Sequence, residues 1–275
     1  MIRLLFLLLT TAVAWGDPLR VMSYNVRFPS QGDGPDVWEQ RRGLFIESIR
    51  RVKPDLIGTQ ELFKMQGDYL VQSLPEFAWF GRSRRGNEQD EHMGVFYRKD
   101  RLQLVEQGDF WLSETPDTPG SQSWNMSLPR MATWGLFEDR QTKQRFYFLN
   151  THFAHRGEDE EARLKSAAVI TARIKQLKPS IPVIVTGDFN APAGGPVYKA
   201  MLETGLQDTR SIAAKTEGPE GTFHGFKGNA GTRRIDWILV SPGWKVLSNV
   251  TDDFHQGERY PSDHFPVFAD LEYPR

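Results

Sequence analysis

The strongest constraint on the fold is the alternation of strand-like and helix-like segments along almost the whole chain. Short apolar runs bounded by polar or glycine-containing turns predict strands, and apolar residues three and four positions apart predict helices. Strands are predicted at residues 20–26, 55–59, 95–97, 102–110, 132–137, 145–152, 182–186, 235–240, 246–251 and 265–271. Helices are predicted at residues 38–52, 63–74, 159–177 and 197–203.

The interleaving of these segments predicts one layered α/β domain. The sequence has no internal repeat and no stretch that looks like a linker between domains. Successive strands look antiparallel, and helices separate some of them. We therefore expect two mainly antiparallel sheets packed face to face, with helices on their outer sides.

Composition limits the chemistry. The chain has 34 Lys and Arg against 35 Asp and Glu, so its net charge of −1 argues against a strongly basic nucleic-acid coat. It has no Cys, which excludes disulfides, thiolate metal sites and a cysteine nucleophile. Any reaction must therefore use oxygen and nitrogen groups.

The first residues predict export. A basic start is followed by an apolar run and by small residues at the spacing of a cleavage site, which is typical of a signal peptide at residues 1–16. The alternative is an anchor helix, but about 20 apolar residues are needed to span a bilayer. We expect a secreted or periplasmic protein with no stable membrane anchor, whose domain covers residues 17–275. The absence of Cys favours a bacterial host.

Polar and acidic side chains lie where predicted strands run out into loops. The motifs are residues 23–26 (Ser-Tyr-Asn-Val), 58–61 (Gly-Thr-Gln-Glu), 150–153 (Asn-Thr-His-Phe), 187–190 (Gly-Asp-Phe-Asn), and the pair 234–237 (Arg-Ile-Asp-Trp) and 262–264 (Ser-Asp-His). Each signal alone is weak, since such residues commonly cap turns or face solvent. Their recurrence at strand ends indicates an active site, because strands fix side chains and loops leave them accessible.

Carboxylates and amides in this pattern suit a hard divalent cation. Glu61 with Asp263 or Asn25 can supply oxygen ligands. In the later motifs, Asp188 and Asn190 can hold a water and a phosphate oxygen, and Asp236 can orient His264.

In this order the motifs resemble the endonuclease/exonuclease/phosphatase superfamily, to which deoxyribonucleases, deadenylases and neutral sphingomyelinases belong. The resemblance extends from Asn25 to His264 and therefore covers nearly all of the chain after the signal peptide. It implies a four-layered α/β/β/α sandwich. It also implies hydrolysis of phosphate esters with Mg²⁺ or Mn²⁺.

The resemblance assigns site residues. The metal ligands are expected to be Glu61, Asn25 and Asp263, and the catalytic residues to be His152, Asp188, Asn190, Asp236 and His264. Residues expected to contact the substrate or to support those that do are Glu91, Arg130, His155, Arg163 and His224. Asp188 is expected to activate water. One departure is Arg27, because abasic-site endonucleases carry an acidic residue at that position, which makes a repair endonuclease a poor interpretation.

The predicted reaction is a metal-assisted attack of water on a phosphate ester, most simply by a phosphodiesterase or nuclease. The alternatives are a phosphomonoesterase for inositol or sugar phosphates, a phospholipid head-group phosphodiesterase, and a non-catalytic binding module. A calcineurin-like metallophosphatase requires a Gly-Asn-His-Asp/Glu element that the sequence lacks. The expected partner is the substrate, which is a nucleic acid, a phospholipid or a small phosphorylated molecule, and no obligate protein partner is expected.

Overall fold

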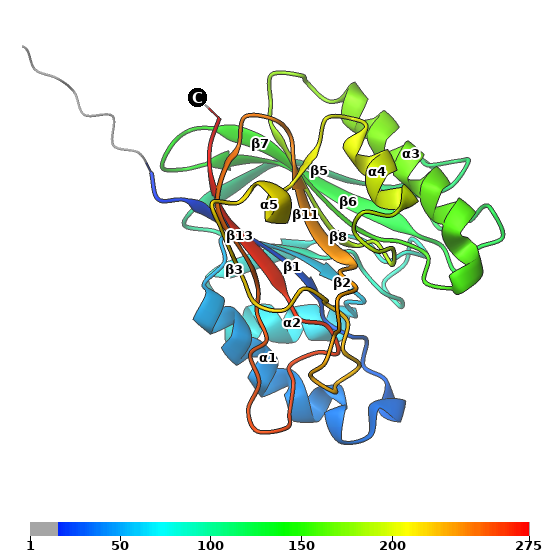
Figure 1. The fold of residues 1–275 in the computed structure, drawn as a ribbon, viewed down its shortest axis with the longest axis vertical. Helices are drawn as coiled ribbons and strands as arrows, with labels where there is room; N and C mark the ends of the chain where they lie inside the picture. The colour runs from blue at the N-terminus through cyan, green and yellow to red at the C-terminus, as the bar shows by residue number, and fades with distance from the viewer. Residues whose placement is uncertain (1–15, 275) are drawn as a thin grey trace, which may run out of the picture.

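Two β-sheets packed face to face form the centre of the computed structural model, which describes residues 16–274 (Figure 1). The predicted signal peptide, apart from Gly16, lies outside these described residues. No helix within residues 16–274 combines the length and apolar character needed to cross a membrane.

The first sheet has seven strands in the described chain and the second has six. In spatial order the first contains β10 (Lys215–Glu217), β12 (Lys245–Thr251), β13 (Val267–Glu272), β1 (Leu19–Asn25), β2 (Leu56–Gln60), β4 (Val95–Arg98) and β3 (Phe77–Phe80). The second contains β5 (Leu102–Trp111), β6 (Met131–Asp139), β7 (Arg145–His152), β8 (Val183–Asp188), β11 (Asp236–Val240) and β9 (Gln207–Asp208). The pairs β1–β2, β10–β12 and β7–β8 are parallel and the other neighbours are antiparallel, which confirms two mainly antiparallel sheets.

Helices cover the outer faces of both sheets (Figure 1). The covering helices are α1 (Trp38–Val52), α2 (Lys64–Ser73), α3 (Glu160–Gln176) and α4 (Pro196–Leu202). The other helices of the described chain are η1 (Gln31–Asp36), η2 (Gly157–Asp159) and α5 (Thr209–Ile212), and α5 contacts strands of both sheets. Phe45 and Ile49 of α1 pack with Met22 of the first sheet, and Ile170 of α3 packs with Leu149 of the second. This order of layers confirms the four-layered α/β/β/α sandwich.

The alternation of side chains along the strands builds the layers. Val21 points into the core between the sheets, whereas Met22 points toward α1. Leu56 of the first sheet and Phe148 and Ile184 of the second belong to the same inner core. Because strands expose successive side chains on opposite faces, both faces of each sheet are apolar and are covered.

A polar layer joins the two sheets beneath the strand ends that carry the motifs. The fully buried Asn150 accepts hydrogen bonds from Gln60 Nε2 at 2.7 Å and Thr186 Oγ1 at 3.1 Å, and its amide donates to the Thr59 carbonyl at 2.6 Å. A Cβ at Gly58 would lie 2.2 Å from Thr186 Oγ1, so only glycine fits there. These contacts fix the spacing of the sheets at that end.

The predicted helices correspond to α1, whose bounds agree with the prediction, and to α2, α3 and α4, whose ends each differ from it by one residue. The sequence pattern did not predict β3, β9, β10 or α5. β3 is an edge strand whose Phe-Ala-Trp-Phe sequence lacks apolar-polar alternation. The others have two to four residues, which is too short for a periodic signal.

Candidate active site

The sheets bring the predicted motifs together by strand register. Asp188 at the end of β8 lies beside His152 of β7 on one side and Asp236 of β11 on the other. Asn25 ends β1 in the opposite sheet, next to Gln60, which directly precedes Glu61. Residues far apart in the sequence therefore meet at one end of the sandwich.

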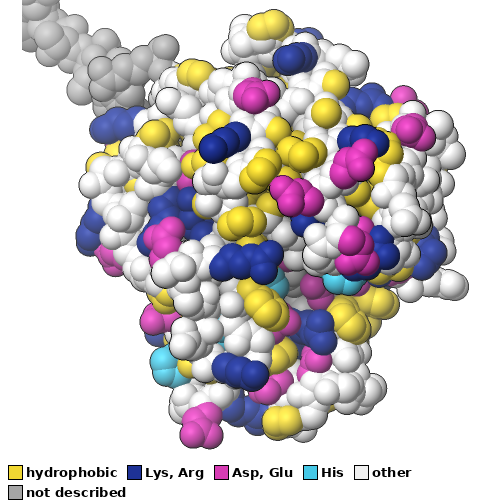
Figure 2. All heavy atoms as spheres, turned by 45° about the vertical axis from the view of Figure 1, so that its right-hand side comes forward, with side chains coloured by type: hydrophobic (Ala, Val, Ile, Leu, Met, Phe, Trp, Pro, Cys, Tyr) yellow, Lys and Arg dark blue, Asp and Glu magenta, His cyan; other side chains and the backbone are white. Residues whose placement is uncertain are grey.

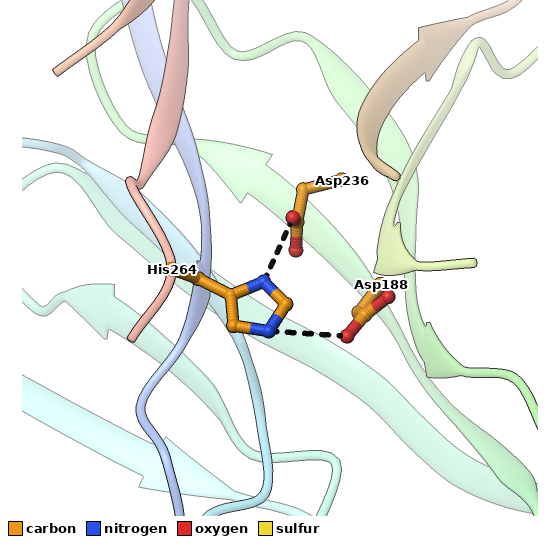
Figure 3. Close-up of side chains that lie close together, drawn as sticks. All are labelled: Asp188, Asp236 and His264. Atoms are coloured by element: carbon orange, nitrogen blue, oxygen red, sulfur yellow. Dashed lines mark hydrogen bonds and ion pairs between the residues drawn. The ribbon is translucent and has the colours of Figure 1, made fainter. Parts of the chain in front are cut away.

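Asp188, Asp236 and His264 form the buried centre of the site (Figure 3). His264 Nδ1 lies 3.0 Å from Asp236 Oδ2, and His264 Nε2 lies 3.8 Å from Asp188 Oδ2. Burial alone would lower the pKa of His264, but the nearby carboxylates, Asp236 foremost, raise it to about 10. The imidazole is therefore a cation between two acidic side chains at neutral pH.

Asp188 has the protonation behaviour expected of a general base near neutral pH. Burial and the charge of Asp236 raise the pKa of Asp188 to about 7, despite the opposing effect of His264. Its Oδ1 accepts a hydrogen bond from the Asn190 backbone amide at 2.9 Å, and its Oδ2 accepts one from Asn25 Nδ2 at 3.0 Å. The carboxylate is thus held in one orientation.

Asn25 joins the two acidic parts of the site. Its Nδ2 also donates to Glu61 Oε1 at 3.1 Å, while its Oδ1 accepts from the Arg27 backbone amide at 3.0 Å. The amide group therefore orients Glu61 and Asp188, and its oxygen already has a partner. In this arrangement Asn25 supports the predicted metal site through Glu61.

Asn190 and His152 form a second contact beside Asp188. Asn190 Nδ2 lies 3.0 Å from His152 Nε2, and it donates to the Phe153 carbonyl at 3.1 Å. Burial and the charges of Arg130 and Arg84 hold the pKa of His152 well below its usual value. His152 is therefore neutral, and its Nε2 accepts from the Asn190 amide.

Glu61 and Asp263 offer the donor set that best fits a divalent cation. Both carboxylates lie near the same guanidinium, with Arg27 Nη1 3.9 Å from Glu61 Oε2 and Arg27 Nε 3.8 Å from Asp263 Oδ2. Glu61 is held in the left-handed region with φ of 59°, and its Oε2 accepts from the Phe28 amide at 3.2 Å. Oxygen donors on a fixed backbone at a partly open site suit Mg²⁺ or Mn²⁺, which retain waters.

A second group of possible ligands fits a metal less well. Asp188, Asp236 and His264 place ligand atoms within 4.8 Å of one another. A protonated imidazole has no free lone pair for a metal, and the raised pKa keeps His264 protonated at neutral pH. We therefore assign these three side chains to proton transfer and charge stabilisation.

Basic and acidic residues line the far side of His152. Glu91 pairs with Arg84 at 2.6 Å, and its Oε2 lies 3.9 Å from His152 Nδ1, close but beyond hydrogen-bond length. Burial and the charge of Glu61 raise the pKa of Glu91 to about 7. The buried Arg130 reaches the exposed His155, with Nη2 3.1 Å from the Nδ1 of that ring.

Two of the predicted residues, Arg163 and His224, make contacts that support the site. Arg163 Nη1 donates to the carbonyls of Ala154 at 2.9 Å and Arg156 at 2.8 Å, so it holds the loop that carries His155. His224 is stacked on Phe265 with ring centroids 4.1 Å apart. Burial and the charge of His264 lower the pKa of His224 to about 3, so it packs as a neutral ring.

Two residues that support the site were not predicted from the sequence. Arg41 on α1 is 1% exposed and donates to the carbonyls of Val26 at 2.7 Å and Pro261 at 2.9 Å, so it ties two site loops together. Ser262 Oγ donates to the Asn25 carbonyl at 2.7 Å. The Ser-Asp-His motif could have indicated Ser262, whereas Arg41 has the sequence pattern of a surface arginine.

An exposed aromatic side chain beside His264 was also not predicted from the sequence. Phe223 is 50% exposed, and its ring centroid lies 5.0 Å from that of His264. Figure 2 shows histidine and acidic side chains together on one part of the surface, with hydrophobic side chains beside them. The site therefore combines a charged interior with apolar surface at its edge.

Comparisons with known proteins agree with this geometry. The sequence model described as endonuclease/exonuclease/phosphatase family matches residues 22–264. A mannosyl-6-phosphatase from Bacteroides thetaiotaomicron is 37% identical, and the match covers 92% of this chain and 99% of that chain with a TM-score of 0.87. A family protein from Bacteroides vulgatus is 33% identical over 94% of this chain and 100% of that chain, with a TM-score of 0.88.

Nocturnins are more distant matches in sequence and in structure. Nocturnin from Drosophila melanogaster is 24% identical over 94% of this chain, which spans 47% of the length of that protein. The catalytic domain of human Nocturnin, solved with a sulfate anion, is 22% identical with a TM-score of 0.74, covering 94% of this chain and 97% of that chain.

Proposed function

Because the chain belongs to the endonuclease/exonuclease/phosphatase family, we propose that it is a divalent-metal-dependent phosphomonoesterase that acts on a phosphorylated sugar. Family membership confirms the resemblance seen in the motifs and makes the chain a phosphoric ester hydrolase. Members of this family depend on divalent metals and act on substrates that include nucleic acids and sugar phosphates. The substrate class, the identity of the metal and export are parts of the proposal.

One observation carries the catalytic part of the proposal. The carboxylate of Asp188 lies 3.8 Å from the cationic His264 ring, which Asp236 holds from its other side. A base with a pKa near 7 and a fixed cation beside it suit the attack of water on an anionic phosphate. The similarity to a mannosyl-6-phosphatase, at 37% identity over most of both chains, supports a phosphorylated sugar as the substrate.

Different residues of the chain serve in proton transfer, in charge stabilisation and in orientation of the phosphate. Asp188 accepts the proton of the attacking water, a role that contributes roughly 10²–10⁴-fold to the rate. His264 keeps its proton because of Asp236, and it stabilises the negative charge that grows on the phosphate oxygens. The Asn190 amide donates to the neutral His152 in the resting site, and we propose that it turns to orient a phosphate oxygen when the substrate binds.

Glu61 and Asp263 would hold the divalent cation, and Asn25 would orient Glu61. When bound, the cation supplies positive charge that neutralises the phosphate and the leaving oxygen. Phe223 offers an apolar ring beside His264, where the non-phosphate part of a substrate can pack. We also propose that residues 1–16 direct export, on the basis of their basic and apolar pattern.

A substrate panel tests the proposal. Purified protein with Mg²⁺ or Mn²⁺ is assayed for phosphate release from mannose 6-phosphate and other hexose phosphates. Bis(p-nitrophenyl) phosphate, DNA, RNA and sphingomyelin are assayed in parallel. We expect the highest kcat/KM for a hexose phosphate. A higher kcat/KM for a diester or a nucleic acid would overturn the sugar-phosphate assignment in favour of a phosphodiesterase or nuclease.

A further inference from the structure

Arg27 is a rigidly held cation at the edge of the predicted metal site. Its backbone has φ of 56°, in a region that only glycine adopts easily. Its carbonyl accepts hydrogen bonds from Arg41 Nη2 at 2.7 Å and from Gln66 Nε2 at 3.0 Å, and both donors are buried. These hydrogen bonds hold the strained backbone of Arg27 in place, and they therefore fix the position of its Cα and Cβ atoms.

The guanidinium is also fixed. Its Nε and Nη2 atoms form a two-point ion pair with Asp33, at 3.1 Å and 2.7 Å, and its Cζ lies 4.3 Å from the centroid of the Phe28 ring. A two-point pair of this kind restrains the orientation of an arginine more strongly than a single contact.

The Nη1 edge of this guanidinium lies beside Glu61, and its N–H groups are available to bind a ligand. Among residues 16–274, Nη1 has no hydrogen-bond acceptor, and the nearest carboxylate oxygen, Glu61 Oε2, is 3.9 Å away. The side chain is 25% exposed, so the edge is reachable. Arg84 and Arg130, two further arginines near the site, are buried and turn toward Glu91 and His155.

A fixed cation in this position distinguishes substrates by charge. At neutral pH a phosphomonoester carries a second negative charge that a diester lacks. In the diester, the oxygen that would carry this charge is bonded to the second alcohol group. An arginine N–H binds a phosphate oxygen by a charge-assisted hydrogen bond, which is stronger when the oxygen carries more charge. The extra attraction is therefore available only to the monoester.

We propose that Arg27 binds a non-bridging oxygen of the terminal phosphate and selects phosphomonoesters over phosphodiesters. This inference rests on the proposed metal-dependent phosphoesterase function. It assigns a role to the position where the sequence departs from the acidic pattern of abasic-site endonucleases, and it gives Asp33 the role of a positioning residue.

The test compares two substrates with the same leaving group, p-nitrophenyl phosphate and bis(p-nitrophenyl) phosphate. Arg27→Met removes the charge and keeps the length of the side chain. We expect kcat/KM for the monoester to fall by roughly 10- to 100-fold, the range for a hydrogen bond to a charged group, with a much smaller change for the diester. Arg27→Lys restores part of the loss. Arg42→Met, an exposed arginine on α1, is the matched control and leaves both rates unchanged.

A binding measurement separates this proposal from the proposed function. Calorimetry measures the affinity of inorganic phosphate for Mg²⁺-loaded protein, and the Mg²⁺ affinity is measured in the same way. We expect Arg27→Met to weaken phosphate binding without weakening Mg²⁺ binding. Equal losses on both substrates, or unchanged phosphate affinity, would overturn the role of Arg27. If the wild-type protein hydrolyses neither substrate, the proposed function fails, and the phosphate affinity still decides the role of Arg27.

Discussion

His264 Nδ1 lies 3.0 Å from Asp236 Oδ2 in a part of the site where both side chains are almost fully buried. Two groups that depend on each other in this way act as one unit. Asp236→Asn and His264→Gln are each expected to lower kcat by roughly 10²–10⁴-fold. The double variant is expected to be little worse than the worse single variant. A double-mutant cycle on kcat/KM measures the coupling, and additive losses would remove the pair from the mechanism.

The pH dependence of the reaction is expected to follow the titration of Asp188 and His264, because Asp236 affects the pKa of both. We expect the rate to rise as Asp188 loses its proton, at a pKa of about 7, and to fall as His264 loses its proton, at a pKa of about 10. The charge of Asp236 raises both pKa values. Asp236→Asn should therefore move both limbs of the kcat/KM profile to lower pH. Limbs that stay in place would show that Asp236 does not set the charge of the site.

The stability of the metal-free protein should depend on the same histidine. The folded-state pKa of His264 is about 10, above the ordinary value of 6.5. The stabilisation of the folded state by protonated His264 is therefore complete below about pH 6.5 and is lost as the pH rises toward 10. His264→Gln should flatten the dependence of the unfolding free energy on pH between these values. Urea denaturation at several pH values measures this, and an unchanged slope would contradict the assignment.

Glu61 should dominate metal affinity. Glu61→Gln keeps the size of the side chain but removes the charge that Mg²⁺ or Mn²⁺ requires. We expect weaker Mn²⁺ binding by calorimetric titration and strongly reduced hydrolysis, with folding retained. Glu160→Gln, on the exposed start of α3, is the control. Unchanged affinity in Glu61→Gln would place the metal elsewhere, at the Asp188 centre or at His152 and His155.

The polar layer between the sheets should be costly to remove. In a buried setting, Asn150→Ala removes the donor to the Thr59 carbonyl and the shortest hydrogen bond of Gln60 Nε2, which keeps only longer contacts to Ser23 and Gly58. An unsatisfied buried group costs about 1–3 kcal/mol, so we expect the unfolding free energy to fall by at least that amount. Urea denaturation measures the change, with the exposed Gln103→Ala on β5 as the control. Equal stability of the two variants would show that this layer does not hold the sheets together.

Export can be tested directly. If residues 1–16 are a signal peptide, protein recovered from the periplasm or medium should begin at Trp15 or Asp17. Sequencing of the N-terminus decides this. An intact Met1 on exported, folded protein would refute the cleavage.

Much of the fold could be predicted because its signals are local. The apolar spacing in α1 and the runs in β7 and β8 are properties of neighbouring residues. The convergence of Asn25, Asp188 and His264 could be predicted only through the resemblance, because strand order is set by contacts between distant segments. The role of Arg41 was missed for the same physical reason. Its partner, the Pro261 carbonyl, is distant in sequence and carries no periodic signal.

The central claim is metal-dependent hydrolysis of a phosphorylated sugar with Asp188 as the base. The most direct measurement is phosphate release from mannose 6-phosphate by wild-type protein and by Asp188→Asn, each with Mg²⁺ and after chelation. With metal, we expect rapid release by the wild-type protein and a loss of roughly 10²–10⁴-fold in kcat in the variant, and we expect no release by either protein after chelation. Undiminished release by Asp188→Asn, or by the chelated wild-type protein, would contradict it.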